Sequence, residues 1–200
     1  MSKAASSGKI PGERSSPKRD HLVRTAWNLF YRNGYHAVGI DTVLAEARVA
    51  KMTLYNHFDS KEDLIVAALE TTAKDLDDQL LAAIQAAGTD PLVRLRAVFG
   101  WLEAWVRAPG FSGCAYMKAA GEYGAAADKP RLVAVEVKER LCVQLAALTT
   151  EAGLRKPERL ARQLMLLIDG AVMHAHLHKR PDYAVEAREA AEALIAAAQK

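Results

Sequence analysis

The sequence predicts an all-α protein of about nine helices, with a small N-terminal helical unit followed by a larger one. Apolar residues recur at spacings of three and four between breaks that contain Gly or Pro, which is the pattern of amphipathic helices. Alanine is abundant and aromatic residues make up only 6% of the chain, a composition that favours helix over sheet. No segment alternates apolar and polar residues with the period of two that half-buried strands show.

The first helix follows a polar N-terminal segment. Residues 1–17 are rich in Ser, Gly and Pro and are predicted to form a disordered tail. Ser16 followed by Pro17 is a plausible helix start, because proline suits the first turn of a helix. Gly34 ends the helix after about 16 residues, as glycine does just past a helix end. Its apolar face consists of Leu22, Ala26, Leu29 and Phe30.

Three more helices follow within the next 50 or so residues. The second spans residues 40–47 and is capped by Gly39, and the third spans residues 51–58. The fourth opens at Ser60, where the sequence SKED has the spacing of a capping box, and continues to about Ala86. We place a domain boundary inside this helix, with residues 18–64 forming the first domain and residues 65–200 the second.

Beyond Gly88 every segment again shows helical periodicity. Prolines and glycines separate the segments, as at Pro109-Gly110 and at Pro181. Five further helices are therefore predicted, over residues 91–107, 113–123, 130–152, 157–178 and 183–198.

Charge is unevenly distributed along the chain. Residues 1–61 contain 10 Lys and Arg against 5 Asp and Glu, whereas residues 62–200 contain 17 against 19. A basic N-terminal part beside a mildly acidic remainder indicates a polyanionic partner for the first part only. The alternative is a basic tail without a partner. However, residues 1–17 carry only three of those 10 basic side chains, so most of the excess lies in the helical region.

Two short helices joined by the three-residue turn 48–50 describe a helix-turn-helix. In that motif the second helix enters the DNA major groove with its N-terminal residues leading. Leu54 and Phe58 are spaced to face the core. The opposite face then carries Lys51, Met52, Tyr55 and Asn56, flanked by Thr53.

These residue types suit DNA. Lysine, threonine and tyrosine can bind phosphates, lysine can also reach a guanine edge, and methionine can contact a thymine methyl. Lys61 lies at the start of the fourth helix, where its ammonium and the free backbone N–H groups both suit a phosphate. Helix-turn-helix geometry also occurs in all-α proteins that do not bind DNA, so spacing and charge alone leave both interpretations open.

The stretch from Arg24 to Leu69 resembles the N-terminal domain of the TetR/AcrR family of transcriptional regulators. The segment TLYNHFDSKEDL is highly specific to that family. The matching residues include Ala26, Leu29, Phe30, Gly34, Tyr35, Ile40, Ala45, Ala47, Val49, Thr53, Leu54, Tyr55, His57, Phe58, Ser60, Lys61 and Leu64.

The resemblance implies a three-helix helix-turn-helix domain that binds a palindromic operator of double-stranded DNA as a homodimer. It also implies a larger helical C-terminal domain that dimerises through its last two helices and binds a small-molecule inducer. Carried over by position, the DNA contacts fall on Lys51, Met52, Thr53, Tyr55, Asn56, His57 and Lys61.

Three positions depart from the family pattern. Gly39 stands where Ser or Thr often caps the second helix, and glycine is still an acceptable cap. Ala50 replaces a frequent Ser at the start of the recognition helix, which removes a capping hydroxyl. Arg48 replaces the usual turn glycine. If its φ is positive, arginine costs on the order of 1 kcal/mol there, and we hypothesise that Arg48 offsets this strain with a phosphate contact.

The effector pocket is predicted from aromatic, Met and acidic residues in the C-terminal helices. For most of them, packing at helical spacing is an equally available explanation. Glu122 and Asp169 stand out because they lie in apolar stretches, where buried carboxylates need partners. The candidates are Trp101, Trp105, Phe111, Tyr116, Met117, Glu122, Tyr123, Met165, Asp169, Met173 and His174.

Other chemistries are less well supported. His174 and His178 share a helix face as zinc ligands can, but no further ligand completes a set, so no metal and no cofactor are predicted. Cys114 and Cys142 are expected to be reduced core thiols. The chain lacks a phosphate-binding glycine loop, an HExxH motif and a nucleophile elbow, so we do not expect an enzyme.

Together with the family resemblance, these patterns predict a ligand-responsive, homodimeric transcription regulator. We expect a repressor that a small-molecule effector releases from its operator. Helices 157–178 and 183–198 carry apolar and alanine-rich faces suited to dimerisation. The alternative is a helical small-molecule-binding or catalytic protein with a vestigial helix-turn-helix. The N-terminus lacks the apolar core of a signal peptide and no run is long enough to cross a membrane, so we expect a cytoplasmic protein without a membrane partner.

Overall fold

The structure, a computed structural model, describes residues 16–199. This range contains nine α-helices and no strand, which confirms the predicted all-α class. Ser16 and Pro17, the last residues of the predicted tail, begin the first helix, and residues 1–15 lie outside the described range. The helices are α1 (Pro17–Asn33), α2 (Ile40–Ala47), α3 (Lys51–Tyr55), α4 (Lys61–Ala86), α5 (Pro91–Arg107), α6 (Ala115–Glu122), α7 (Lys129–Glu151), α8 (Pro157–His178) and α9 (Asp182–Gln199).

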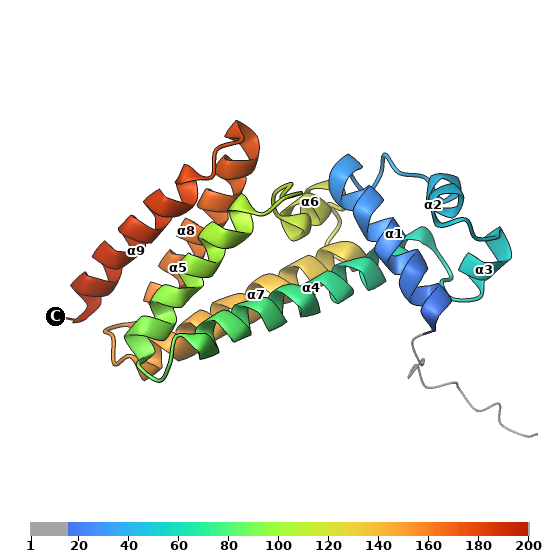
Figure 1. Cartoon of the computed structure of the whole chain (residues 1–200). Helices are drawn as coiled ribbons and strands as arrows, with labels where there is room; N and C mark the ends of the chain where they lie inside the picture. Colours follow the sequence, from blue (N-terminus) through green and yellow to red (C-terminus); the bar gives the residue numbers. More distant parts are fainter. Residues whose placement is uncertain (1–15, 200) are drawn as a thin grey trace, which may run out of the picture.

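The molecule is elongated, with α1, α2 and α3 gathered at one end (Figure 1). α4 starts beside these helices and runs along α7, while α5, α8 and α9 complete the larger body. The short helix α6 lies between the two parts. No helix within residues 16–199 is both long and apolar enough to span a membrane.

Side chains at the helix starts explain where several helices begin. The Ser16 hydroxyl accepts the Arg19 backbone N–H at 3.2 Å, directly before Pro17. At α4, the Ser60 hydroxyl accepts the Asp63 N–H at 3.1 Å and donates to the Asp63 carboxylate at 2.7 Å. The capping box predicted from SKED is therefore present.

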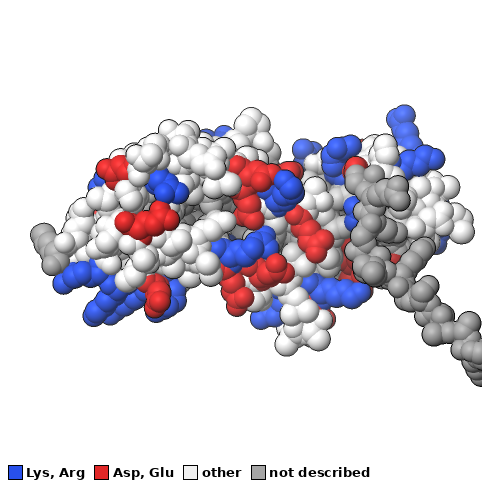
Figure 2. All heavy atoms as spheres, turned by 90° about the horizontal axis from the view of Figure 1, so that it is seen from below, with Lys and Arg blue, Asp and Glu red and all other residues white. Residues whose placement is uncertain are grey.

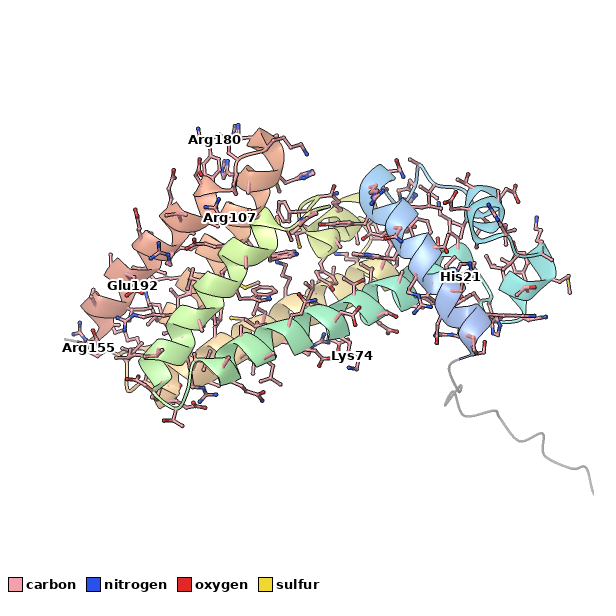
Figure 3. The ribbon with its side chains drawn as sticks, in the orientation of Figure 1. His21, Lys74, Arg107, Arg155, Arg180 and Glu192 are labelled. Atoms are coloured by element: carbon pink, nitrogen blue, oxygen red, sulfur yellow. The ribbon has the colours of Figure 1, made fainter. Side chains whose placement is uncertain are left out.

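The N-terminal helices pack around an apolar centre. Leu22 and Phe30 of α1 are buried together with Leu44 of α2 and Leu54 of α3. A long-range hydrogen bond adds to this packing, because His21 Nε2 lies 3.1 Å from the Ala47 carbonyl oxygen at the end of α2. The His21 side chain accordingly points from α1 toward α2 and α3 (Figure 3).

The two parts of the chain share one helix. α4 is 26 residues long, and the boundary we placed after Leu64 falls within its first turn. Leu64 and Leu69 are fully buried near the α1 end, and Leu80 is buried near the far end. A movement of α4 therefore moves side chains in both cores.

The structure corrects the bounds of two predicted helices. α3 ends at Tyr55 rather than Phe58, because Ser60 must be extended (φ −148°, ψ 169°) to cap α4 and the chain unwinds before it. α6 begins at Ala115 rather than Gly113. Gly113 has φ +84° and Cys114 is extended, so neither residue is helical.

Candidate nucleic-acid interface and interior cavities

The turn between α2 and α3 depends on one left-handed residue. Arg48 has φ 53° and ψ 43° and caps the C-terminal end of α2. Its N–H donates to the Ala45 carbonyl, and the Val49 N–H donates to the Leu44 carbonyl at 3.2 Å. Arg48 therefore has the positive φ on which the expected backbone strain depends. Its side chain is exposed.

Helix α3 presents its polar side to solvent. Leu54 is fully buried and Phe58 nearly so, as their spacing predicted. The opposite side, here called the recognition face, is exposed and consists of Lys51, Met52, Tyr55 and Asn56. Met52 is 70% exposed and Tyr55 is 45% exposed.

Three predicted contact residues lie at the edge of this face. Thr53 and His57 are half-buried, and the His57 ring meets Phe58 edge-on. Lys61 is also half-buried, with Nζ donating to the His36 carbonyl at 3.4 Å and lying 6.0 Å from the centre of the Phe30 ring. Burial lowers the pKa of Lys61, although Glu122 and Glu62 act in the opposite direction.

Figure 2 shows how charge is distributed on one side of the molecule. Acidic side chains gather over the middle of that side, and basic side chains project at the end that carries α1, α2 and α3 and again at the far end. The cations at the first end agree with the basic excess of residues 1–61, and they surround the elements that would approach a polyanion.

Glu122 ties α6 to the turn that follows α1. Its carboxylate accepts the Tyr35 N–H at 3.0 Å and the His36 N–H at 2.6 Å, and its carbonyl oxygen lies 2.9 Å from His36 Nε2. Gly34 makes this approach possible. It has φ +94°, and a Cβ there would lie 3.1 Å from Glu122 Oε1. Glu122, predicted as a pocket residue, lies in this structure as a clasp between the two parts of the chain.

Among the described residues, three hollows contain predicted effector residues. An inner cavity of about 50 Å³ between α4, α5, α7 and α8 contains Trp101, Trp105, Tyr116 and Asp169. A junction cleft of about 290 Å³ between α1, α4 and the segment 105–116 contains Trp105, Phe111 and Tyr116. A surface groove of about 350 Å³ between α6, α7 and α8 contains Tyr116, Met117, Met165 and Asp169.

Three other predicted pocket residues lie elsewhere. Tyr123 is buried against Tyr35 and His36, and burial raises its pKa to about 12. Met173 is 45% exposed on the surface of α8. The His174 ring stacks on His178 at 5.6 Å and packs on Tyr183 at 5.2 Å, outside the three hollows. Residues 16–199 contain no group of three or more His, Cys, Asp or Glu side chains placed to hold a metal ion.

Asp169 has the partner that a buried carboxylate requires. Its Oδ1 accepts a short hydrogen bond from Lys138 Nζ on α7, and both side chains are about three-quarters buried. Burial acts to lower the pKa of Lys138, but Cys114 and Asp169 outweigh it, so the pKa lies above its ordinary value. Lys138 and Cys114 both line the inner cavity. No local sequence pattern predicts this cluster, because its members lie far apart in the chain.

Helix α1 also contributes to the junction cleft, which the sequence analysis did not anticipate. Trp27 and Tyr31 stack with ring centres 4.9 Å apart and line the cleft. The Tyr31 hydroxyl donates to the Gly113 carbonyl at 2.8 Å and accepts the Ser112 N–H at 2.8 Å. A side chain of the helix-turn-helix part is thereby fixed to the loop that precedes α6.

This geometry is that of a helix-turn-helix domain of the kind that reads double-stranded DNA. The long helix α4 joins this domain to a larger helical domain that contains cavities. The model of bacterial regulatory proteins of the tetR family matches residues 22–68, and the model of the tetracyclin repressor-like C-terminal domain matches residues 91–191. The chain therefore belongs to the TetR family of bacterial transcriptional regulators, and its DNA-binding domain is the helix-turn-helix. Members of this family are regulators, not enzymes.

Known relatives extend over both parts of the chain. The transcriptional regulator AcuR of Cereibacter sphaeroides is 30% identical over 169 residues, which cover 80% of this chain and 77% of AcuR. The HTH-type transcriptional repressor DhaR of Mycobacterium sp. (strain GP1) is 32% identical over 84 residues, or 42% of each chain. The crystal structure of SCO4454, a TetR-family regulator from Streptomyces coelicolor, has a TM-score of 0.86 at 30% identity and covers 92% of this chain and 96% of that one.

Proposed function

We propose that this protein is a cytoplasmic, homodimeric repressor that binds a palindromic operator and is released by a small-molecule effector. The observation that carries the proposal is the recognition face of α3. The recognition face is polar and exposed, and it includes Met52, which is 70% exposed, while Leu54 and Phe58 hold the opposite side of the helix in the core. This separation lets α3 enter a groove without disturbing the fold.

Roles for individual side chains follow from their positions. Lys51 and Met52, in the first turn of α3, would reach base edges, because N-terminal residues lead a recognition helix into the groove. Tyr55 and Thr53 would bind phosphates through their hydroxyls. Asn56 and His57, where α3 ends, and Lys61, at the first residue of α4, would bind the adjacent backbone.

Substitution of Arg48 can separate the effect of its left-handed backbone strain on stability from the effect of its side chain on DNA binding. Replacing Arg48 with Gly should raise the melting temperature by about 2–4 °C, because glycine removes a left-handed strain of roughly 1 kcal/mol. It should also weaken DNA binding and reduce the salt slope by about 1, if Arg48 binds a phosphate. Thermal melts and anisotropy titrations measure the two effects.

The matched control for this prediction is Lys179→Gly. Lys179 caps the end of α8 with φ 56°, so it has the same backbone strain at a site remote from α3. Lys179→Gly should raise the melting temperature without changing DNA affinity. A melting temperature that does not change in Arg48→Gly would remove the strain part of the hypothesis.

Dimerisation is supported by the outer side of α8. Leu166 is 73% exposed, Leu177 is 65% exposed, and Met173 lies between them. The adjacent α9 exposes Ala190, Ala193 and Ala197, whose small side chains permit close helix approach. Two copies paired through α8 and α9 would form a four-helix interface with two-fold symmetry. Their recognition faces would then meet successive major grooves about 34 Å apart.

Effector release is supported by the position of the hollows. The inner cavity and the junction cleft share Trp105 and Tyr116, and the cleft reaches α1 through Trp27 and Tyr31. A ligand there would favour a different separation of the two recognition faces. To empty an occupied operator it must prefer the unbound conformer by several kcal/mol, up to about 5.5 for a complete switch.

The alternative function, a ligand-binding or catalytic helical protein with a vestigial helix-turn-helix, makes the opposite prediction about DNA. We would measure binding to a pool of duplexes by fluorescence anisotropy across a salt series. Wild type should select specific sequences with a steep salt slope. Tyr55→Phe combined with Lys61→Ala should lower affinity about tenfold and flatten the slope.

Lys74→Ala is the matched control for this experiment. Lys74 is an exposed lysine on α4 that pairs with Asp78 and points away from α3 (Figure 3). It should leave DNA binding unchanged. Weak binding that is equal for all sequences and insensitive to Tyr55 and Lys61 would favour the alternative. A reporter gene placed behind the selected operator then tests repression, because an activator would raise expression instead of lowering it.

A further inference from the structure

Aromatic side chains are concentrated around the junction cleft, which lies where α1 meets α4 (Figure 1). The chain has 3 Trp, 6 Tyr and 4 Phe residues, and five of these line the cleft. By comparison, three line the inner cavity and one lines the surface groove. The five come from α1, from the end of α5, from the loop that follows it and from α6: Trp27, Tyr31, Trp105, Phe111 and Tyr116.

The rings of the cleft present both faces and edges to a ligand. Trp27 and Tyr31 of α1 are stacked, with ring centres 4.9 Å apart and ring planes 13° apart. Trp105 and Phe111 meet edge to face, with ring centres 5.4 Å apart and ring planes at 88°. All four side chains are half-buried, so part of each remains accessible. Stacking and edge-to-face contact are the two arrangements that aromatic rings prefer, so the cleft suits a planar aromatic molecule.

Several polar groups of the cleft have no hydrogen-bond partner in the protein. The indole N–H groups of Trp27 and Trp105 donate to no protein atom within residues 16–199. Thr72, Asp75 and Gln79 lie on one side of α4, line the cleft and make no hydrogen bond in the same range. An indole N–H is a donor that usually finds a partner when it is covered. A ligand that covers these rings is therefore expected to carry an acceptor.

The size and charge of the cleft restrict the ligand further. Its volume of about 290 Å³ lies near the lower end of the range for small-molecule sites, which is roughly 300–1,000 Å³. Arg24 of α1 and Asp75 of α4 both line the cleft and are exposed, so the two walls carry one charge of each sign. The cleft therefore suits a small molecule without a net charge.

The inner cavity is less suitable for such a ligand. Its volume is only about 50 Å³, and the ion pair of Lys138 and Asp169 forms part of its wall. A molecule with two fused rings would have to push the surrounding helices apart and separate this pair, which would leave a partly buried charge without its partner. The junction cleft accepts a ligand without either change.

We propose that the junction cleft binds a neutral, planar aromatic compound of one or two rings that carries a hydrogen-bond acceptor such as a carbonyl. The ligand rings stack on Trp27 and Tyr31 of α1, and the acceptor takes the indole N–H of Trp27 or Trp105. This site lies between the helix-turn-helix and the larger helical domain. It is distinct from a pocket within the C-terminal helices, where the family resemblance places the inducer.

A ligand in the cleft would act directly on α1, and this step rests on the proposed function. Tyr31 is held at both ends, because its hydroxyl donates to the Gly113 carbonyl and Lys118 Nζ donates to its own carbonyl at 3.0 Å. Trp27 lies one helical turn earlier, and no hydrogen bond of its side chain holds it. A ligand that presses on Trp27 therefore tilts α1 about Tyr31, and α3 moves with α1 because the two helices share one core.

The three tryptophans of the chain allow the site to be located in the unmodified protein. Trp27 lines the junction cleft, Trp101 lines the inner cavity, and Trp105 lines both. The full chain is labelled with isotopic nitrogen at tryptophan, and the three indole N–H signals are followed by NMR as naphthyl methyl ketone is added. The Trp27 signal should move saturably and further than the Trp101 signal. Movement of Trp101 without Trp27, or no saturable movement, would overturn the proposal.

Two analogues of this ketone test the chemical class of the ligand. Decalyl methyl ketone keeps the carbonyl and the two-ring size but has no aromatic face, and ethylnaphthalene keeps the rings but has no acceptor. Each should bind about tenfold more weakly than naphthyl methyl ketone. Equal binding of the saturated ketone would refute the aromatic class, and equal binding of ethylnaphthalene would refute the need for an acceptor.

Two variants that add an aromatic ring distinguish the junction cleft from the inner cavity. Thr72→Phe fills the cleft and should weaken binding of naphthyl methyl ketone about tenfold or more. Leu141→Phe is the matched control, because Leu141 lines the inner cavity and not the cleft, and its affinity should stay at the wild-type value. Circular dichroism establishes that each variant is folded. Wild-type affinity in folded Thr72→Phe, or a loss confined to Leu141→Phe, would show that the cleft is not the site.

A separate measurement tests the effect on DNA. Saturating naphthyl methyl ketone should weaken operator binding by wild type about tenfold, a coupling of ordinary size for two linked sites, and should have no effect on operator binding by Thr72→Phe. Unchanged operator binding by wild type with an occupied cleft would overturn the regulatory step. Failure of the ligand-free protein to bind DNA would instead count against the proposed function, and the indole signals would still decide whether the cleft binds the ketone.

Discussion

Replacing Gly113 with Ala is expected to destabilise the protein by about 2–4 kcal/mol. Gly113 has φ +84°, where a side chain costs roughly 1 kcal/mol. A Cβ there would lie 2.9 Å from His176 Cγ and 3.1 Å from Cδ2, closer than atoms pack, which adds about 1–3 kcal/mol. His176 Cβ, which a rotation of the ring does not move, would lie 3.2 Å away, and Phe111 meets the ring edge-on at 6.5 Å. The melting temperature should fall by about 4–16 °C at equal protein concentration.

Gly88→Ala is the matched control for this prediction. Gly88 has φ +88°, yet nothing lies within 4 Å of a Cβ at that position. It should therefore lose only the backbone part, about 1 kcal/mol. The difference between the two variants isolates the contact with His176. Adding His176→Ala to Gly113→Ala should recover most of that difference, and equal losses for the two glycine variants would show that the ring simply moves aside.

Local sequence signals predicted most of the fold because they act within a single turn of chain. The bounds of α5 and α8 agree with prediction at both ends, since Pro91 and Pro157 mark the first residue of each helix. The starts and ends that were wrong depend on neighbours. α3 stops early because Ser60 has to cap the next helix, and α6 starts late because Gly113 is left-handed against His176.

The recognition face was predictable for the same reason, because helical spacing alone places Leu54 and Phe58 opposite Lys51 and Met52. The interior was not. Lys138 and Asp169 are 31 residues apart and meet only through the packing of α7 on α8. No pattern within either helix selects one lysine among several as the partner.

Glu122 accepts two backbone N–H groups of the turn that follows α1, and its substitution should have a large effect. Glu122→Gln keeps one carbonyl acceptor but points an amide NH₂ at the other backbone N–H. The Tyr35 and His36 N–H groups now share the carboxylate, and losing one hydrogen bond to a charged acceptor costs about 2 kcal/mol. We expect the melting temperature to fall by about 4–8 °C.

The local effect distinguishes this clasp from an ordinary surface charge. Hydrogen exchange at the Tyr35 and His36 amides should accelerate roughly 30-fold, because about 2 kcal/mol of protection is lost. Glu136→Gln, which removes an exposed pair with Arg140, should cost less than about 0.5 kcal/mol and leave both amides protected. Unchanged exchange in Glu122→Gln would show that the clasp does not hold the turn. If exchange does accelerate, α6 and the helix-turn-helix are coupled through this carboxylate. A structural change at the start of α6 can then be transmitted through Glu122 to the turn that follows α1.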